Sequence, residues 1–231
     1  MRTKRILLAS SAAAVISSVT AAQAGTDFYI NVSGGGNFQG DRSSSFDTLF
    51  DEASAHIDPD TGFVISGAFG VHLQRWLAGL RAEIEASFRR NELGGLWTTE
   101  TSFIFSDSGP IDGHLSTFAM LANVWYDIDI GLKAVPYVGG GVGWGRSKFE
   151  GAFLGAGPSA TFSIENSGFV YQLGGGLNYE VQDGVHLGMG YRYFRGPTVR
   201  GNVFLGKAGS LPIQGENDNH SVLISLTIDT N

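Results

Sequence analysis

Residues 168–194, GFVYQLGGGLNYEVQDGVHLGMGYRYF, alternate with a period of two between apolar side chains and small or polar ones. Successive side chains of a β-strand point to opposite faces, so this pattern predicts strands and not helices. Asp183-Gly184 interrupts the alternation where a tight hairpin needs the positive φ that Gly supplies. Each arm is about ten residues long, the length of a tilted strand that crosses a membrane. An apolar, aromatic face opposite a glycine-rich one indicates a small barrel whose outer face contacts lipid.

The same period recurs along the chain and predicts eight strands. Their bounds are residues 27–38, 61–73, 76–90, 112–127, 134–146, 168–181, 185–194 and 218–228. The connections alternate between long and short, and the long polar ones are residues 39–60, 91–111, 147–167 and 196–217. Outer-membrane barrels alternate in this way. The sequence therefore predicts an all-β fold: an eight-stranded antiparallel up-and-down transmembrane β-barrel with short periplasmic turns and four long external loops.

The first 24 residues have the pattern of a secretory signal peptide. Three basic residues near the start precede an apolar stretch at residues 6–19, and Ala22-Gln23-Ala24 fits the small-x-small rule for cleavage. The expected domains are a cleaved signal peptide at 1–24 and an outer-membrane barrel at 25–231. No other run approaches the roughly 18 apolar residues of a spanning helix, so a membrane location requires a barrel.

Charge and composition exclude several classes of site. The chain has 22 acidic and 15 basic residues, which argues against a nucleic-acid partner because phosphates require a basic surface. It has no Cys, and its five His residues are not at metal-ligand spacing, so we expect no metal and no cofactor. The glycine clusters at 139–145 and 174–176 lack the motifs of phosphate-binding loops.

Several charged residues are expected inside the barrel. Arg81, Glu83, Glu85 and Arg89 share the polar face of one predicted strand, and Arg192 lies on the polar face of another. The two strands would lie across the barrel from each other, so we expect Arg192 to pair with Glu83 or Glu85. An eight-stranded barrel is only wide enough to be filled by side chains. A structural network of Arg81, Glu83, Glu85 and Arg192 is therefore favoured over a charged pore lining.

Four segments carry a resemblance to a known family: PYVGGGVGWG at 136–145, GFVYQLGGGLNYEV at 168–181, LGMGYRYF at 187–194 and HSVLISLTI at 220–228. They resemble the eight-stranded outer-membrane barrels of Gram-negative bacteria, the opacity-protein-like and surface-antigen group related to the barrel of outer membrane protein A. The resemblance implies a place in the cell outer membrane, contact with its lipids and lipopolysaccharide, and delivery by the barrel assembly machinery. It departs at Ile228, where such barrels usually carry an aromatic residue.

The function expected from these features is a structural or surface-interaction role, with an extracellular partner reached through the loops, and not that of a wide porin. We expect no enzymatic activity and no catalytic residues. The alternatives are a narrow channel, a soluble lipocalin-like binder, and a lipid A-modifying enzyme. The last rests on His114-Leu115-Ser116, because some outer-membrane lipid A deacylases carry a His-x-Ser pair that faces lipid. A nucleophile and base of this kind would need a third group to orient them.

Cleavage of the signal peptide is expected between Ala24 and Gly25, because the small-x-small rule is met there. Mass spectrometry of the protein from the membrane fraction should give Gly25 as the first residue. A mature protein that keeps Arg2, Lys4 and Arg5 would contradict the assignment.

Overall fold

The computed structural model describes residues 27–39, 42–47, 52–59, 61–100, 106–153, 160–204 and 210–230. The expected signal peptide at 1–24 lies outside these residues. The strands are β1 (Phe28–Gln39), β2 (Arg42–Asp47), β3 (Glu52–Pro59), β4 (Gly62–His72), β5 (Leu80–Glu100), β6 (Ser106–Asp127), β7 (Ala134–Phe153), β8 (Ala160–Gln182), β9 (Val185–Arg195), β10 (Val199–Phe204), β11 (Ser210–Gly215) and β12 (Asp218–Thr230). The described residues include no helix that is long and apolar enough to cross a membrane.

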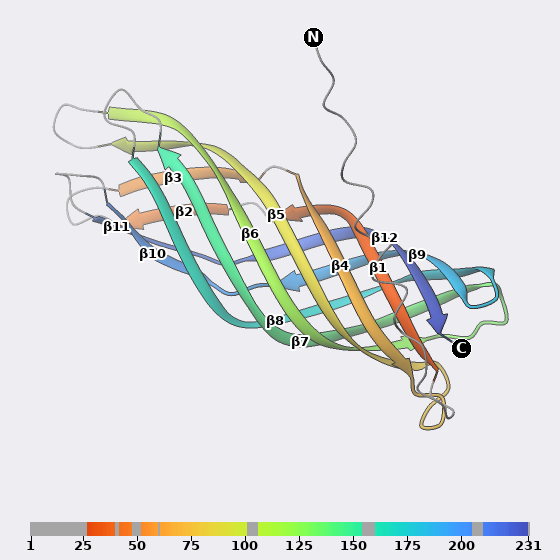
Figure 1. Ribbon diagram of the computed structural model, residues 1–231. Helices are drawn as coiled ribbons and strands as arrows, with labels where there is room; N and C mark the ends of the chain where they lie inside the picture. The colour runs from red at the N-terminus through yellow and green to blue at the C-terminus, as the bar shows by residue number, and fades with distance from the viewer. Residues whose placement is uncertain are drawn as a thin grey trace, which may run out of the picture.

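Eight of these strands form a closed antiparallel barrel. Their order around the wall is β1, β4, β5, β6, β7, β8, β9 and β12, and β12 pairs with β1 to complete the ring (Figure 1). A closed ring leaves no open sheet edge, so backbone N–H and C=O groups are paired without water. The prediction of an eight-stranded up-and-down barrel is therefore confirmed.

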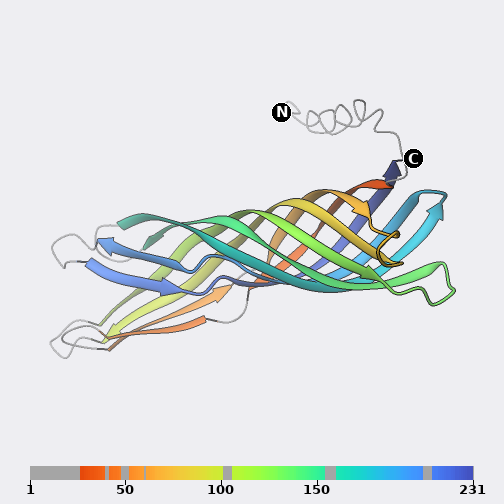
Figure 2. The same cartoon turned by 90° about the horizontal axis from the view of Figure 1, so that it is seen from below.

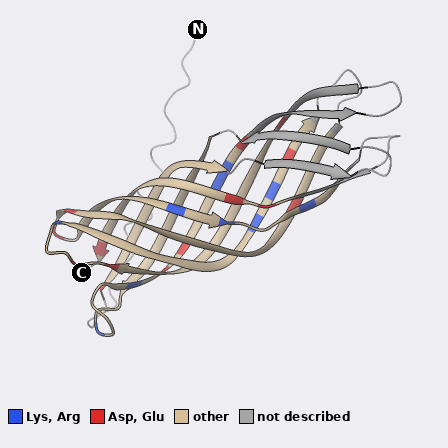
Figure 3. Cartoon of the chain, turned by 180° about the vertical axis from the view of Figure 1, so that it is seen from behind, with Lys and Arg blue, Asp and Glu red and all other residues tan. Residues whose placement is uncertain are grey.

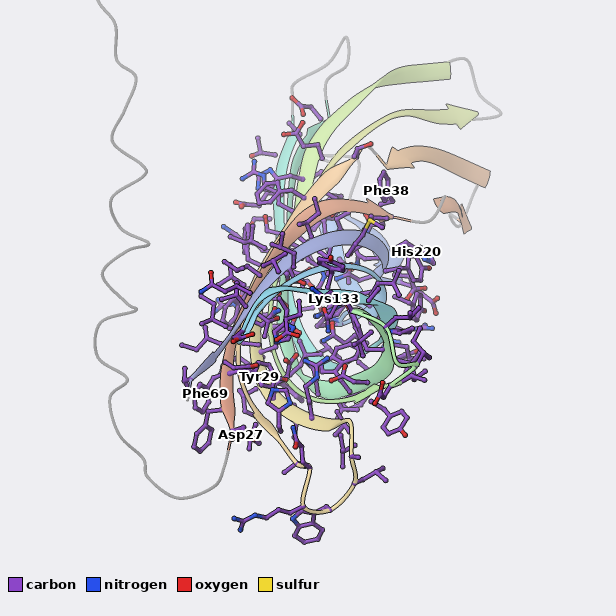
Figure 4. The ribbon with its side chains drawn as sticks, turned by 90° about the vertical axis from the view of Figure 1, so that its right-hand side faces the viewer. Asp27, Tyr29, Phe38, Phe69, Lys133 and His220 are labelled. Atoms are coloured by element: carbon purple, nitrogen blue, oxygen red, sulfur yellow. The ribbon has the colours of Figure 1, made fainter. Side chains whose placement is uncertain are left out.

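The barrel wall has an apolar outer face and an inner face of polar or small residues. On β5, for example, Ile84 is 55% exposed and its neighbour Glu85 is 1% exposed. Figure 4 shows Phe69 projecting away from the barrel, whereas Tyr29 on the adjacent strand β1 is buried. Figure 3 shows how few ribbon positions along the wall carry Lys, Arg, Asp or Glu. This pattern is typical of a barrel in lipid.

Glycine on the inner face keeps the barrel narrow. A Cβ atom at Gly143 of β7 would collide with the backbone carbonyl of Met120 on β6, so only Gly allows the two strands to approach this closely. The short connections use glycine for a different reason. Gly79, Gly131 and Gly184 have φ angles of 82°, 71° and 71°, a backbone conformation that L side chains rarely adopt.

The prediction of long loops at one end of the barrel was wrong in its detail. β5, β6, β7 and β8 continue well past the expected strand ends, and the segments 39–60 and 196–217 contain the hairpins β2–β3 and β10–β11. Figure 2 shows these extensions gathered at one end of the barrel. On β7 and β8 the extensions reverse the pattern of the wall, because apolar side chains such as Phe149 and Phe162 are buried and the residues between them are charged or polar and face outward. The backbone still pairs with a neighbouring strand.

One short connection is longer than expected. The predicted strand at 76–90 begins only at Leu80, and residues 73–79 form a turn in which Trp76 is 86% exposed. The amide of Leu73 donates to the carbonyl of Leu80 at 2.8 Å and closes this turn. The expected tight turn at Asp183-Gly184 lies where the sequence placed it, between β8 and β9.

Candidate functional site

The centre of the lumen is the carboxylate of Glu85, which is 1% exposed. Its Oε2 atom accepts hydrogen bonds from Arg192 Nη1 at 2.5 Å, Asn123 Nδ2 at 2.8 Å and Gln172 Nε2 at 2.9 Å. These donors come from β9, β6 and β8, so one carboxylate joins four strands across the barrel. A charged pair with neutral hydrogen-bond donors around it is the arrangement that stabilises a buried carboxylate.

Glu83 is held by neutral donors and not by an arginine. Tyr29 Oη donates to its Oε2 at 2.8 Å, and Trp125 Nε1 and Asn123 Nδ2 donate to its Oε1 at 2.8 and 2.9 Å. Asn123 therefore bridges Glu83 and Glu85. The pairing expected for Arg192 has Glu85, and not Glu83, as the hydrogen-bonded carboxylate.

Arg81 has a separate partner that the sequence did not reveal. Its Nε and Nη2 atoms donate to Asp127 at 2.7 and 2.8 Å, which is the bidentate geometry of a guanidinium on a carboxylate. The guanidinium also lies 5.3 Å from the ring centroid of Tyr29 and 5.8 Å from that of Tyr137. The structure thus brings Arg192 and Glu85 into contact and places Arg81 with Asp127.

Arg89 is buried against an aromatic ring. It is 2% exposed, donates one hydrogen bond to Ser87 Oγ at 2.8 Å, and lies 3.7 Å from the ring centroid of Phe194. A cation over an aromatic face is stabilised more strongly when water is absent. Arg192 makes a similar contact with Trp125 at 4.8 Å.

Two further layers lie toward the extended hairpins. The first is polar and neutral: Asn37 Nδ2 donates to Asn91 at 2.6 Å and to Asn219 at 2.7 Å, and Asn217 donates to Ser147 at 2.9 Å. The second is an apolar cluster of buried side chains from β6, β7, β8 and β10. Its members are Leu115, Phe149, Phe162, Ile164 and Val199. The lumen is thus occupied by successive layers of side chains.

The opposite end of the lumen holds one carboxylate between two imidazoles. Asp229 of β12 lies 3.2 Å from His72 of β4 and 3.1 Å from His186 of β9. His72 also packs against Tyr29, with ring centroids 5.0 Å apart. In the part of the chain that the structure describes, no group of three or more His, Cys, Asp or Glu residues could hold a metal ion.

His114 and Ser116 of the His114-Leu115-Ser116 motif lie on the outer face of β6, and Leu115 between them is buried. His114 Nε2 is 3.4 Å from Glu150 Oε2 on β7, and Lys148 Nζ is 2.8 Å from Glu150 Oε1. Ser116 is aligned with Lys148 in the β6–β7 register. The sequence did not supply an acidic partner for His114. The register of the β6–β7 pair could have identified this partner, because it places Glu150 directly opposite His114.

Comparison with known proteins gives a consistent result. The family model described as the outer membrane protein beta-barrel domain matches residues 7–220. An outer membrane protein of Gluconacetobacter diazotrophicus is 27% identical over 209 residues, which are 83% of this chain and 52% of that protein, so the chain spans about half of this relative's length.

Two solved structures share the fold. The crystal structure of Neisserial surface protein A (NspA) has a TM-score of 0.50 and 16% identity, and the alignment covers 89% of this chain and 99% of that one. The outer membrane protein OprG from Pseudomonas aeruginosa has a TM-score of 0.51 and 12% identity, with 87% and 95% covered. At these identities the likeness shows the fold alone.

Removal of the Arg192 charge should destabilise the barrel strongly. Arg192→Met keeps most of the side-chain volume but leaves the Glu85 carboxylate without its hydrogen-bonded cation. Breaking a buried pair costs about 3–5 kcal/mol. Arg75→Met, on the exposed turn 73–79, is the matched control and should change little. Urea unfolding of the barrel in detergent micelles measures both, and the double variant Glu85→Gln/Arg192→Met should recover part of the loss. Equal unfolding midpoints for the two single variants would contradict a stabilising role for the pair.

Proposed function

The chain belongs to the outer membrane protein β-barrel domain family, and we propose that it serves there as a structural or surface-interaction protein and not as a wide porin. The observation that carries this proposal is the combination of a lumen occupied by side chains with long hairpin extensions at one end. A barrel of eight strands has no room for a wide channel once its inward side chains are in place. The hairpin extensions reach beyond the closed ring of eight strands, so they are the part proposed to interact with other molecules.

The extended end is proposed to face the cell exterior. The described chain begins at β1 and ends at β12 on the other end of the barrel, where the short turns also lie (Figure 1). A chain delivered from the periplasm leaves its termini and short turns on the periplasmic side. The proposed signal peptide at 1–24, with cleavage between Ala24 and Gly25, and recognition by the barrel assembly machinery belong to the same route of delivery.

Charged pairs on the outer face support a place for the extended end outside the hydrocarbon region. Arg146 pairs with Glu165 and Lys148 with Glu150, all on the parts of β7 and β8 that extend beyond the apolar surface. The hydrogen bond from Arg146 lowers the pKa of the Glu165 carboxyl, so this pair is charged at neutral pH. Fixed charges of this kind are destabilising at the centre of a bilayer and acceptable near its surface. We therefore propose that the hydrocarbon region ends below these pairs, on the side of the short turns.

The same group of charged residues on the outer face is relevant to the alternative function, a lipid A-modifying enzyme. The contact between His114 and Glu150 is part of a cluster that also contains Lys148, and such pairs are typical of a solvated face. Since a charged surface cluster explains the contact between His114 and Glu150, this contact by itself is no argument for a lipid A deacylase. As an outer-membrane barrel the chain contacts outer-membrane lipids, and its proposed partners are lipopolysaccharide and an extracellular molecule that binds the extended hairpins.

Surface labelling of intact cells tests the orientation. Epitope tags inserted at Ser44 or Gly206, in the segments that contain the hairpins β2–β3 and β10–β11, should bind antibody without permeabilisation. Tags at Gln74 or Asp183, in short turns, should bind only after the outer membrane is opened. The reverse pattern would invert the topology, and recovery of the protein from the soluble fraction would reject the membrane role.

A further inference from the structure

A pocket of about 430 Å³ opens where the pairing of β8 and β9 ends. Residues that line it include Asn166, Phe169, Tyr171, Arg195, Thr198 and Arg200. The last β8–β9 pair is Tyr171 with Arg195, but β8 continues to Ala160 with ladder pairing to β7 alone, and β10 contacts it without extending the sheet. β9 departs through Gly196-Pro197, where Pro has no N–H to extend the ladder. The pocket therefore follows from the way the wall divides at this point.

One wall of the pocket is aromatic and belongs to the outer surface of the barrel. Phe169 is 60% exposed, its ring centroid lies 6.4 Å from that of Tyr171, and Tyr171 lies 6.1 Å from Tyr193. Aromatic residues concentrate at the level of lipid headgroups, because one end of the ring is apolar and the other tolerates water. In the proposed orientation, these rings would lie with the pocket at the level of the headgroups and not among the acyl chains.

The other wall carries Arg195, whose guanidinium has carboxylate partners, and Arg200, whose backbone is bonded to β8. Arg195 Nη2 lies 2.5 Å from Glu216 Oε1 and its Nε lies 3.6 Å from Asp218 Oδ1. The carbonyl of Arg200 accepts a hydrogen bond from Asn166 Nδ2 at 3.1 Å, which fixes this segment against β8. Within the described part of the chain Arg200 has no carboxylate partner, so its charge is available to an anion. A guanidinium binds phosphate in a bidentate fashion.

We propose that this pocket binds the phosphorylated sugar headgroup of an outer-leaflet glycolipid. The phosphate would bind Arg200, with Arg195 as a second donor, and the sugar ring would pack on Phe169 and Tyr171. A bare phosphate would not use the aromatic wall. Glu216 and Asp218, which flank Arg195, reduce the attraction for a small anion but can accept hydrogen bonds from sugar hydroxyls. The inference rests on the proposed orientation, which places this end of the barrel in the outer leaflet.

Binding to the folded full-length mature chain in zwitterionic micelles tests the proposal. The probes are a diglucosamine glycolipid with its phosphates, the same lipid after dephosphorylation, inorganic phosphate and phosphatidylglycerol. Calorimetric titration should show the phosphorylated glycolipid as the tightest ligand. Arg200→Gln should weaken its binding by roughly tenfold, as expected for the loss of a charged hydrogen bond. Phe169→Leu should weaken both forms of the glycolipid, and Arg75→Gln, at the opposite end of the barrel, should change neither.

Two outcomes would overturn the proposal. Equal affinity for the phosphorylated and dephosphorylated lipids, with no effect of Arg200→Gln, would remove the phosphate site. Competition by inorganic phosphate or phosphatidylglycerol as effective as that by the glycolipid would reduce the pocket to a general anion site. Heat-modifiable gel migration confirms that each variant is folded. Because micelles impose no orientation, a negative result leaves the surface-labelling result, and with it the proposed function, untouched.

Discussion

The rest of the structure depends on one constraint: hydrocarbon offers no hydrogen bonds to a strand that crosses it. Every backbone N–H and C=O in the crossing region must therefore pair within the protein, and only a closed ring of strands achieves this with β-structure. The pairing of β1 with β12 completes that ring. Once the ring is closed, the period of two forces alternate side chains outward into lipid and inward into a lumen that is narrow with eight strands.

The narrow lumen in turn decides what its charged residues can do. An isolated buried ion has an effective penalty of several kcal/mol, so a charge that points inward needs partners. Glu85 has Arg192 and two amides, Arg81 has Asp127, and Glu83 has three neutral donors. The partners of Glu85 and Glu83 join β5 to strands that do not follow it directly in the chain, such as β9 and β1, whereas Arg81–Asp127 joins the consecutive strands β5 and β6. The network therefore ties the strands together while it occupies the lumen.

The alternation in the sequence was sufficient to predict which residues of the wall face inward. In a strand, successive side chains point to opposite faces, so assigning one residue to the lumen assigns the others as well. This alternation puts Glu85 and Arg192 on inward faces, and in the structure both are buried and in contact. It could not distinguish Glu83 from Glu85 as the partner of Arg192, since that depends on the stagger between strands. Asp127 was missed because it lies at the end of its strand, where the pattern stops. The extensions of β7 and β8 were missed because their inward face is apolar and their outward face is charged, the reverse of the pattern in the wall. The pocket at Arg200 depends on where β9 leaves the wall.

The central claim is that the lumen is filled by interacting side chains and does not form a wide channel. Recording from the purified barrel in a planar lipid bilayer tests this claim most directly. The account predicts no porin-like conductance, because the polar network around Glu85 and the apolar cluster around Phe149 occupy successive levels of the lumen. Large, stable openings of the wild-type protein would contradict it.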